Sequence, residues 1–214
     1  MERVYGGGTG YRENGCDISG NGGSAECGNA VSAAVKNDAV RNALIRTDRL
    51  TLEPLCRRHF EGARLYSLDQ ENSGMMCFLP CDDEKEVMDY LLKCEAQWQK
   101  EKPDYLDAAV ILDGTHIGAV SIELLENGTV GELGWIINKR FWGRGYAAES
   151  AEAFIGYISE RFGISRFIGH ADSENRASRR AMEKLGMKLV KEYGGRKNRG
   201  SDEERRECLY EMFL

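Results

Sequence analysis

The feature that most constrains this chain is a strand, a glycine loop and a helix that follow one another directly within Glu132–Glu152. The apolar run Leu133–Ile137 predicts a strand. Gly143 and Gly145 lie in the basic loop that follows, and apolar residues then recur every three or four positions, which predicts a helix. Gly163 stands where the end of a helix favours a left-handed residue.

A junction of this kind can bind an anion. The first N–H groups of a helix have no intrahelical partner, and partial positive charge gathers there. Gly143 and Gly145 let the main chain approach a ligand closely, and Arg140 and Arg144 add positive charge that suits a diphosphate. The sequence therefore predicts a phosphate seat, with an ordinary tight turn as the alternative.

Two better-known phosphate loops fit less well. The chain contains no G-x-x-x-x-G-K-S/T, so a P-loop is excluded. A dinucleotide fingerprint would place Ala148 at the third glycine and requires a βαβ unit. The hairpin signals before the loop indicate antiparallel strands instead.

Composition narrows the class of protein further. The net charge of the 214 residues is −6, which argues against general nucleic-acid binding. No apolar run is long enough to span a bilayer, and the first residues lack the apolar stretch of a secretory signal. Seven cysteines without a C-x-x-C pair indicate reduced thiols, and three widely spaced histidines predict no metal site. We therefore expect a cytoplasmic protein that binds neither membrane nor nucleic acid.

The first 43 residues differ from the rest. Nine glycines fall within the first 28 positions, among Asn, Ser and Glu. Such a stretch cannot bury enough apolar surface to offset its ordering entropy. We expect a flexible tail at 1–43, with a short helix near 30–40, and one folded domain at 44–214.

The domain begins with alternating helices and strands. A strand is expected at 50–53, a helix at 57–68, a cysteine-containing loop at 72–81 and a second helix from Asp82 or Asp83 onward. Three antiparallel strands should follow, because Asp113-Gly114 and Asn127-Gly128 are dipeptides favoured in tight hairpins.

The last part of the domain continues this alternation. After the glycine-loop helix we expect a strand at 166–170, a helix at 175–185 that stops at Gly186, and a terminal pair of strands at 187–193 and 208–214. A charged loop at 194–206 separates the last two strands. The element order indicates one α/β domain.

Two sequence patterns resemble the GNAT superfamily of acyl-CoA-dependent N-acyltransferases. The family signature Q/R-x-x-G-x-G/A is matched by Arg140, Gly143 and Gly145, after a three-stranded meander and at the start of a helix. A second pattern, N-x-x-A/S followed by K-x-G-F/M, is matched by these residues: Asn175, Ser178, Lys184, Gly186 and Met187. The resemblance covers about 44–214. It is greatest to the branch that includes ribosomal-protein N-terminal acetyltransferases and aminoglycoside or polyamine relatives. It implies the GNAT fold, a mixed and mostly antiparallel central sheet flanked by helices.

The resemblance also implies an activity and a set of binding residues. The donor is expected to be acetyl-CoA, and the acceptor a primary amine on a small molecule or a protein N-terminus. The pantetheine arm is expected along the main chain of Trp135, Ile136 and Ile137, with Asn175 and Ser178 as further contacts. The diphosphate is expected on the loop beside Arg140, at the amides of Trp142, Gly143, Arg144, Gly145, Tyr146 and Ala147.

The chemistry requires a proton acceptor. An amine attacks a thioester only as the free base, although amines are largely protonated near neutrality. His170 and Glu132 are the candidate bases: imidazole titrates near neutrality, and Glu132 opens the central strand. The alternatives are an ordered water as base and purely structural roles for both side chains.

The proton donor to the leaving thiolate is less defined. Many relatives carry a tyrosine on the second helix, where this chain has Met182. Ser178 could donate the proton or hydrogen-bond to the cofactor, and Tyr210 is a weaker candidate. The missing tyrosine leaves open a second class of function, a CoA-binding sensor or partner protein without turnover. The acceptor's identity is also open, and a homodimer is neither required nor excluded.

Overall fold

The computed structural model describes residues 45–214. The predictions of a tail at 1–43, a helix near 30–40 and a domain boundary at 44 concern residues outside this range. None of the helices in 45–214 combines the length and hydrophobicity needed to cross a bilayer.

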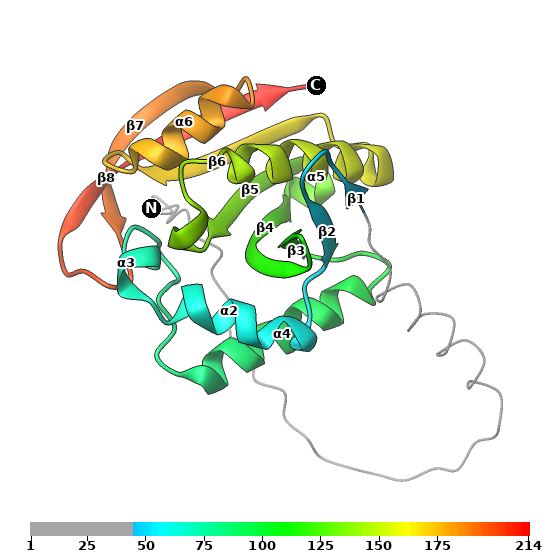
Figure 1. Ribbon diagram of the computed structural model, residues 1–214. Coiled ribbons are helices and arrows are strands. Elements are labelled where there is room, and N and C mark those ends of the chain that lie inside the picture. Colours follow the sequence, from blue (N-terminus) through cyan, green and yellow to red (C-terminus); the bar gives the residue numbers. More distant parts are fainter. Residues whose placement is uncertain (1–44) are drawn as a thin grey trace, which may run out of the picture.

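Eight strands form one sheet in the order β1-β2-β3-β4-β5-β6-β8-β7 (Figure 1). Neighbours run antiparallel except β5 and β6, which are parallel. The strands are β1 (Ile45–Arg46), β2 (Thr51–Pro54), β3 (Tyr105–Leu112), β4 (Thr115–Leu125), β5 (Val130–Ile137), β6 (Arg166–Asp172), β7 (Lys188–Lys197) and β8 (Glu204–Phe213). The sheet is therefore mixed and mostly antiparallel, as expected.

Helices cover both faces of this sheet. α5 (Tyr146–Phe162) and α6 (Arg176–Lys184) lie on one face, and α2 (Phe60–Ser67) and α4 (Glu84–Trp98) lie on the other (Figure 1). Shorter helices occupy the connections: η1 (Arg57–His59), α3 (Gln70–Ser73), η2 (Glu126–Gly128) and η3 (Lys139–Phe141).

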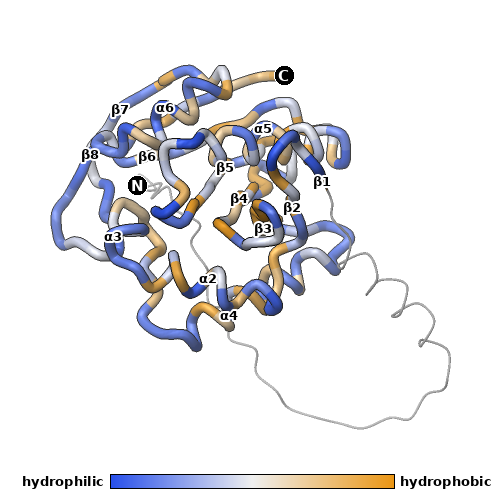
Figure 2. Tube along the Cα trace, viewed as in Figure 1, coloured by the Kyte–Doolittle hydropathy of each residue, from blue (hydrophilic) through white to orange (hydrophobic). Residues whose placement is uncertain are grey.

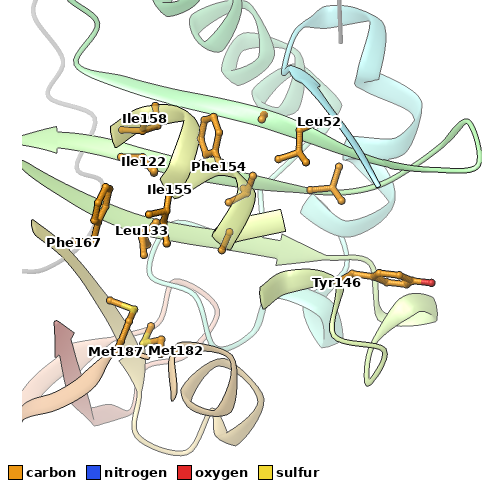
Figure 3. Packing of buried hydrophobic residues seen from close by; sticks show 14 of the residues in the cluster. Leu52, Ile122, Leu133, Tyr146, Phe154, Ile155, Ile158, Phe167, Met182 and Met187 are labelled. Carbon is orange, nitrogen blue, oxygen red and sulfur yellow. The ribbon is translucent and has the colours of Figure 1, made fainter. Parts of the chain in front are cut away.

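Each covered face buries its own apolar cluster. On the α5 face, Phe154 is fully buried in a cluster that also contains residues of the central strands and Met182 of α6 (Figure 3). On the α2 and α4 face, Val87 and Leu91 of α4 pack with Ala63, Ala109 and other buried residues. Burial of each large apolar side chain contributes about 1.5–3 kcal/mol. The central strands are thus held between two cores, whereas the β7–β8 hairpin is mainly hydrophilic (Figure 2).

The turn predictions are confirmed. Asp113 and Gly114 both have positive φ, 48° and 76°, and so do Asn127 and Gly128, 59° and 85°. α5 ends at Gly163 with φ 71°. These positions depend on local dihedral preferences, which is why the sequence alone reveals them.

Some boundaries were predicted wrongly. The helix expected at 57–68 is divided into η1 and α2, and α3 extends into the loop expected at 72–81. The largest error concerns the last hairpin, where strands occupy most of the loop expected at 194–206 and only 198–203 connects them.

A buried polar network explains why this hairpin is long. Arg196 forms an ion pair with Glu207 and donates hydrogen bonds to Asn198 Oδ1 and to the Met75 carbonyl oxygen. Asn198 in turn donates to Asp172 at 2.7 Å. The charged residues that suggested a loop therefore satisfy one another and attach the hairpin to the segment before α4.

Replacement of Arg196 by methionine should lower the free energy of unfolding by about 3–5 kcal/mol, because Glu207 would remain buried without its cation. Urea denaturation followed by circular dichroism measures this. The matched control is Lys197→Met at the exposed neighbouring position. Equal stability of the two variants would contradict a stabilising role for this ion pair.

Candidate functional site

β5 and β6 separate halfway along their length. Residues Val130–Leu133 of β5 pair with Arg166–Gly169 of β6. After these pairs the strands separate, and no strand of the described part of the chain fills the space between 134–137 and 170–172. Asn138 donates to Ile117 on β4 at 2.8 Å. Because backbone direction alternates along a strand, Trp135 directs its N–H and C=O into the opening. The sheet thus offers unpaired main-chain groups at its centre.

The end of β5 is fixed by side chains. The Ile137 carbonyl oxygen accepts hydrogen bonds from the indole of Trp142 at 2.7 Å and from the amide of Asn72 at 3.1 Å. Asn72 also accepts from the Lys139 N–H at 2.6 Å. Trp142 is half exposed, so its indole serves to anchor the loop. The Ile137 carbonyl is consequently engaged by protein donors.

The glycine loop presents a row of main-chain donors. Gly143 and Gly145 have φ of 74° and 81°, values that suit glycine. The first helical hydrogen bond runs from the Glu149 N–H to the Gly145 carbonyl at 3.1 Å. Within residues 45–214, no acceptor contacts the N–H groups of 143–147. The Trp142 N–H, which was expected to join them, donates to the Lys139 carbonyl instead, at 3.3 Å.

Cations surround this row of donors. Arg140 and Arg144 are exposed and form no ion pair with any described residue. A Cβ placed on Gly145 would lie 3.5 Å from Lys184 Nζ and 3.7 Å from a guanidinium nitrogen of Arg49. Neither Arg49 nor Lys184 is predicted to lie at this loop, because both are far from it in the sequence, although Lys184 belongs to the second family pattern.

Arg49 is held in place by several contacts. It pairs with Glu149, donates to the Arg144 carbonyl at 3.0 Å and stacks 4.6 Å from the centroid of the Tyr146 ring. These contacts fix the segment before β2 against the start of α5. A rigid, electropositive helix start favours an anion.

The two candidate bases form a pair. His170 Nδ1 lies 3.0 Å from Glu132 Oε1, and both side chains are mostly buried, with exposures of 14% and 15%. With a proton on Nδ1 donated to Glu132, Nε2 is left to accept a proton. No described residue contacts Nε2.

The pair changes the titration of the imidazole. Burial lowers the pKa of His170, but the hydrogen bond and the charge of Glu132 raise it by more, so the pKa lies above the ordinary 6.5. The Glu132 carboxylate thus both orients the ring and favours its protonated form.

The start of α6 contributes polar groups from the opposite wall. Asn175 caps the helix by accepting from the Ser178 N–H at 3.0 Å, and its own NH₂ group has no acceptor among the described residues. The Ser178 hydroxyl is likewise without a described partner. Met182 is buried and offers no proton. The Tyr210 hydroxyl contacts Arg179 and Glu183, so it is engaged away from this wall.

Three cavities connect these groups. One of about 600 Å³ lies beside the glycine loop and α6, and one of about 100 Å³ contains His170 and Glu132. A third, of about 460 Å³, lies between the sheet and α2 and α4. Met76 and Trp135 line all three, so the cavities adjoin one another. In residues 45–214, no three His, Cys, Asp or Glu side chains are grouped as a metal site.

Comparison with known families identifies the class of protein. The model of the acetyltransferase (GNAT) domain matches residues 49–188. The chain therefore belongs to the GNAT acetyltransferase family, whose members use acetyl-CoA. The fold expected from the two sequence patterns is confirmed.

The individual relatives of the chain share only part of its sequence. The FsC-acetyl coenzyme A-N(2)-transacetylase of Aspergillus fumigatus is 27% identical over 160 residues, which are 70% of this chain and 66% of that protein. The matched regions of two uncharacterized Bacillus subtilis relatives are shorter and cover 46% and 34% of those proteins. The chain thus spans less than two thirds of the length of these relatives.

Solved structures share the fold. A GNAT-family acetyltransferase from Bacillus anthracis has a TM-score of 0.68 at 22% identity, covering 79% of this chain and 97% of that one. The ribosomal L7/L12 α-N-protein acetyltransferase RimL, in complex with coenzyme A, has a TM-score of 0.70 at 13% identity, covering 81% and 98%.

Replacement of Glu132 by glutamine should lower the pKa of His170 below 6.5, because burial would then act without the opposing carboxylate. An NMR titration of the imidazole C–H signals measures the change. His116, whose pKa is lowered to about 4 by burial and by nearby His59, is the internal reference. An unchanged His170 midpoint would show that the two side chains do not interact in solution.

Proposed function

We propose that this protein is an acetyl-CoA-dependent N-acetyltransferase that transfers the acetyl group to a primary amine by direct attack. The observation that carries the proposal is the row of unpaired N–H groups at 143–147, beside the opening between β5 and β6. Main-chain donors at a helix start, with Arg49 and Lys184 nearby, suit the diphosphate of coenzyme A.

The pantetheine arm would extend from this loop along the opening. Trp135 directs main-chain groups into it, and the side-chain amide of Asn175 lies on the opposite wall. An extended amide chain in such an opening replaces the missing strand pairing. The thioester would then reach the small cavity that contains His170 and Ser178.

His170 is proposed to accept the proton of the attacking amine, directly or through one water, at Nε2. The amine nitrogen forms a bond to the thioester carbon, and the developing oxyanion is stabilised by a main-chain N–H near Trp135. The carbon–sulfur bond then breaks, and the thiolate accepts a proton from the Ser178 hydroxyl, the proposed donor. Ser178 regains a proton from solvent while the His170 imidazolium releases its own, so both side chains return to their starting state. Glu132 stabilises the imidazolium during this sequence.

The alternative function, a CoA-binding protein without turnover, rests on Met182 at the position of a tyrosine in many relatives. The pairing of His170 with Glu132 favours catalysis over that alternative, because it provides a base in the small cavity. The test is release of free thiol from acetyl-CoA with a panel of amines that includes peptide N-termini. Tight CoA binding without release would support the alternative.

Gly145→Asp should weaken CoA binding strongly, because a carboxylate beside the donor row would repel the diphosphate and pair with Lys184. Gly145→Asn is the matched control, since asparagine has the same size and tolerates positive φ without the charge. Calorimetry should show at least about a tenfold larger loss for aspartate than for asparagine, a difference of about 1.4 kcal/mol. Equal affinities would remove the loop from the binding site.

His170→Ala should lower kcat about 10²–10⁴-fold with little change in KM for acetyl-CoA, as expected for loss of a general base. In the unaltered protein, kcat/KM should rise with pH through the pKa of His170, because only the neutral ring accepts a proton. In Glu132→Gln that rise should begin at lower pH. A pH profile that is the same in both proteins would point to water as the base.

A further inference from the structure

The third cavity adjoins the one that holds the proposed catalytic pair, because Cys77, Phe78 and Ser121 line both. Its floor is formed by β3, β4 and β5, and its walls by α2, α4 and the segment 76–79. Tyr66 and Trp135 supply apolar wall surface. At about 460 Å³, it has the size of a small-molecule site.

Carboxylates are concentrated in this cavity. Its charged lining residues are Glu86, Asp89, Asp107, Glu123, Lys93 and Arg199. Asp107 accepts a hydrogen bond from Tyr90, Asp89 pairs with Lys85, and Glu86 pairs with Arg199. Glu123 differs from them, since it has no hydrogen bond or ion pair with any residue in 45–214.

The Glu123 carboxylate also lies close to other negative side chains. It lies directly opposite Glu132 on the neighbouring strand, and Asp107 lies opposite Ser121 in the adjacent row. Two carboxylates directly opposite each other destabilise a sheet. A cation bound between them would remove that repulsion. The proposed catalytic pair therefore lies next to a carboxylate, Glu123, that has no cation as a partner within residues 45–214.

The connection between β7 and β8 contributes Arg199 to the lining of the cavity. Arg199 pairs with Glu86 and Asp82 of the segment around the start of α4, and donates to the Phe78 carbonyl at 3.2 Å. The Arg199 N–H also donates to the Met76 carbonyl at 2.9 Å. These contacts tie together Glu86, Phe78 and Met76, which also line the cavity. A bridged wall of this kind leaves less room for a polypeptide than for a small molecule.

We propose that the acceptor is a small amine with a second cationic group, such as a diamine or polyamine, whose distal ammonium binds at Glu123. The amine to be acetylated lies beside His170 and Glu132, and the methylene chain between the two groups packs on Trp135. This proposal rests on the proposed acetyltransferase function and defines its substrate class.

The site has a pH dependence of its own. Burial and the charges of Glu132, Asp107 and Asp104 raise the pKa of Glu123 to about 7. The other charged groups facing the cavity are Glu86, Asp89 and Lys93 of α4 and Arg199 of the hairpin. Below its pKa, Glu123 is neutral and holds an ammonium weakly, and above it the carboxylate binds strongly. Preference for a diamine over a monoamine should therefore grow between about pH 6 and pH 8.

The experiment compares kcat/KM, measured by thiol release from acetyl-CoA, for putrescine against n-butylamine and hexamethylenediamine against n-hexylamine. The diamine of at least one pair should be preferred about tenfold or more, as expected for an added charge pair in a partly buried site. Glu123→Gln should reduce that ratio about tenfold, because only the charge is lost. Glu101→Gln, at an exposed glutamate outside the cavity, is the matched control and should leave the ratio unchanged.

Three outcomes would overturn the proposal: equal rates within both amine pairs, an unchanged ratio in Glu123→Gln, or a preference for peptide N-termini over every diamine. Thermal melting of each variant shows whether it remains folded. CoA binding and transfer to any amine are read separately. If the unaltered protein neither bound CoA nor acetylated any amine, the acetyltransferase function itself would be contradicted.

Discussion

The structure depends on one interruption of hydrogen bonding, the separation of β5 from β6 after four residue pairs. A central strand elsewhere in the sheet has both edges paired, but the end of β5 has one edge open. The opening is stable because α5 and α6 cover one side of it and the connection through Met76 covers the other. The same interruption directs the end of β5 into a glycine loop whose amides stay unpaired. The binding surface is thus a consequence of the sheet's geometry.

A second constraint comes from the opposite end of the chain. The β7–β8 hairpin extends over the segment before α4 and is attached to it by Arg196 and Arg199. That segment lines all three cavities through Met76. The C-terminal hairpin therefore shapes both the proposed catalytic centre and the carboxylate-lined cavity, and its Arg205 also lines the cavity beside the glycine loop. Buried, mutually satisfied charges give this attachment a defined geometry.

Charge is distributed unevenly among the three cavities. Cations at the glycine loop, among them Arg49 and Lys184, suit an anionic donor, whereas Glu123 and Asp107 in the third cavity suit a cationic acceptor. His170 and Glu132 line the smallest of the three cavities. In the proposed reaction, a substrate of either sign would be attracted to its own cavity, and the two reacting groups would meet in the smallest one.

Features set by local preferences could be predicted from the sequence alone. The hairpins at Asp113 and Asn127, the limits of α5 and the glycine loop follow from dihedral preferences and apolar periodicity within a few residues. The motif residues then indicated the family and the donor class. Tertiary structure decided what joins distant segments: His170 meets Glu132 across 38 residues, and Arg49 reaches Glu149 across 100. It also decided that the charged residues around Arg196 form strands and that Glu123 faces Glu132. Such contacts depend on strand order and register, which no local pattern encodes, because a side chain's neighbours across a sheet are set by packing of the whole domain.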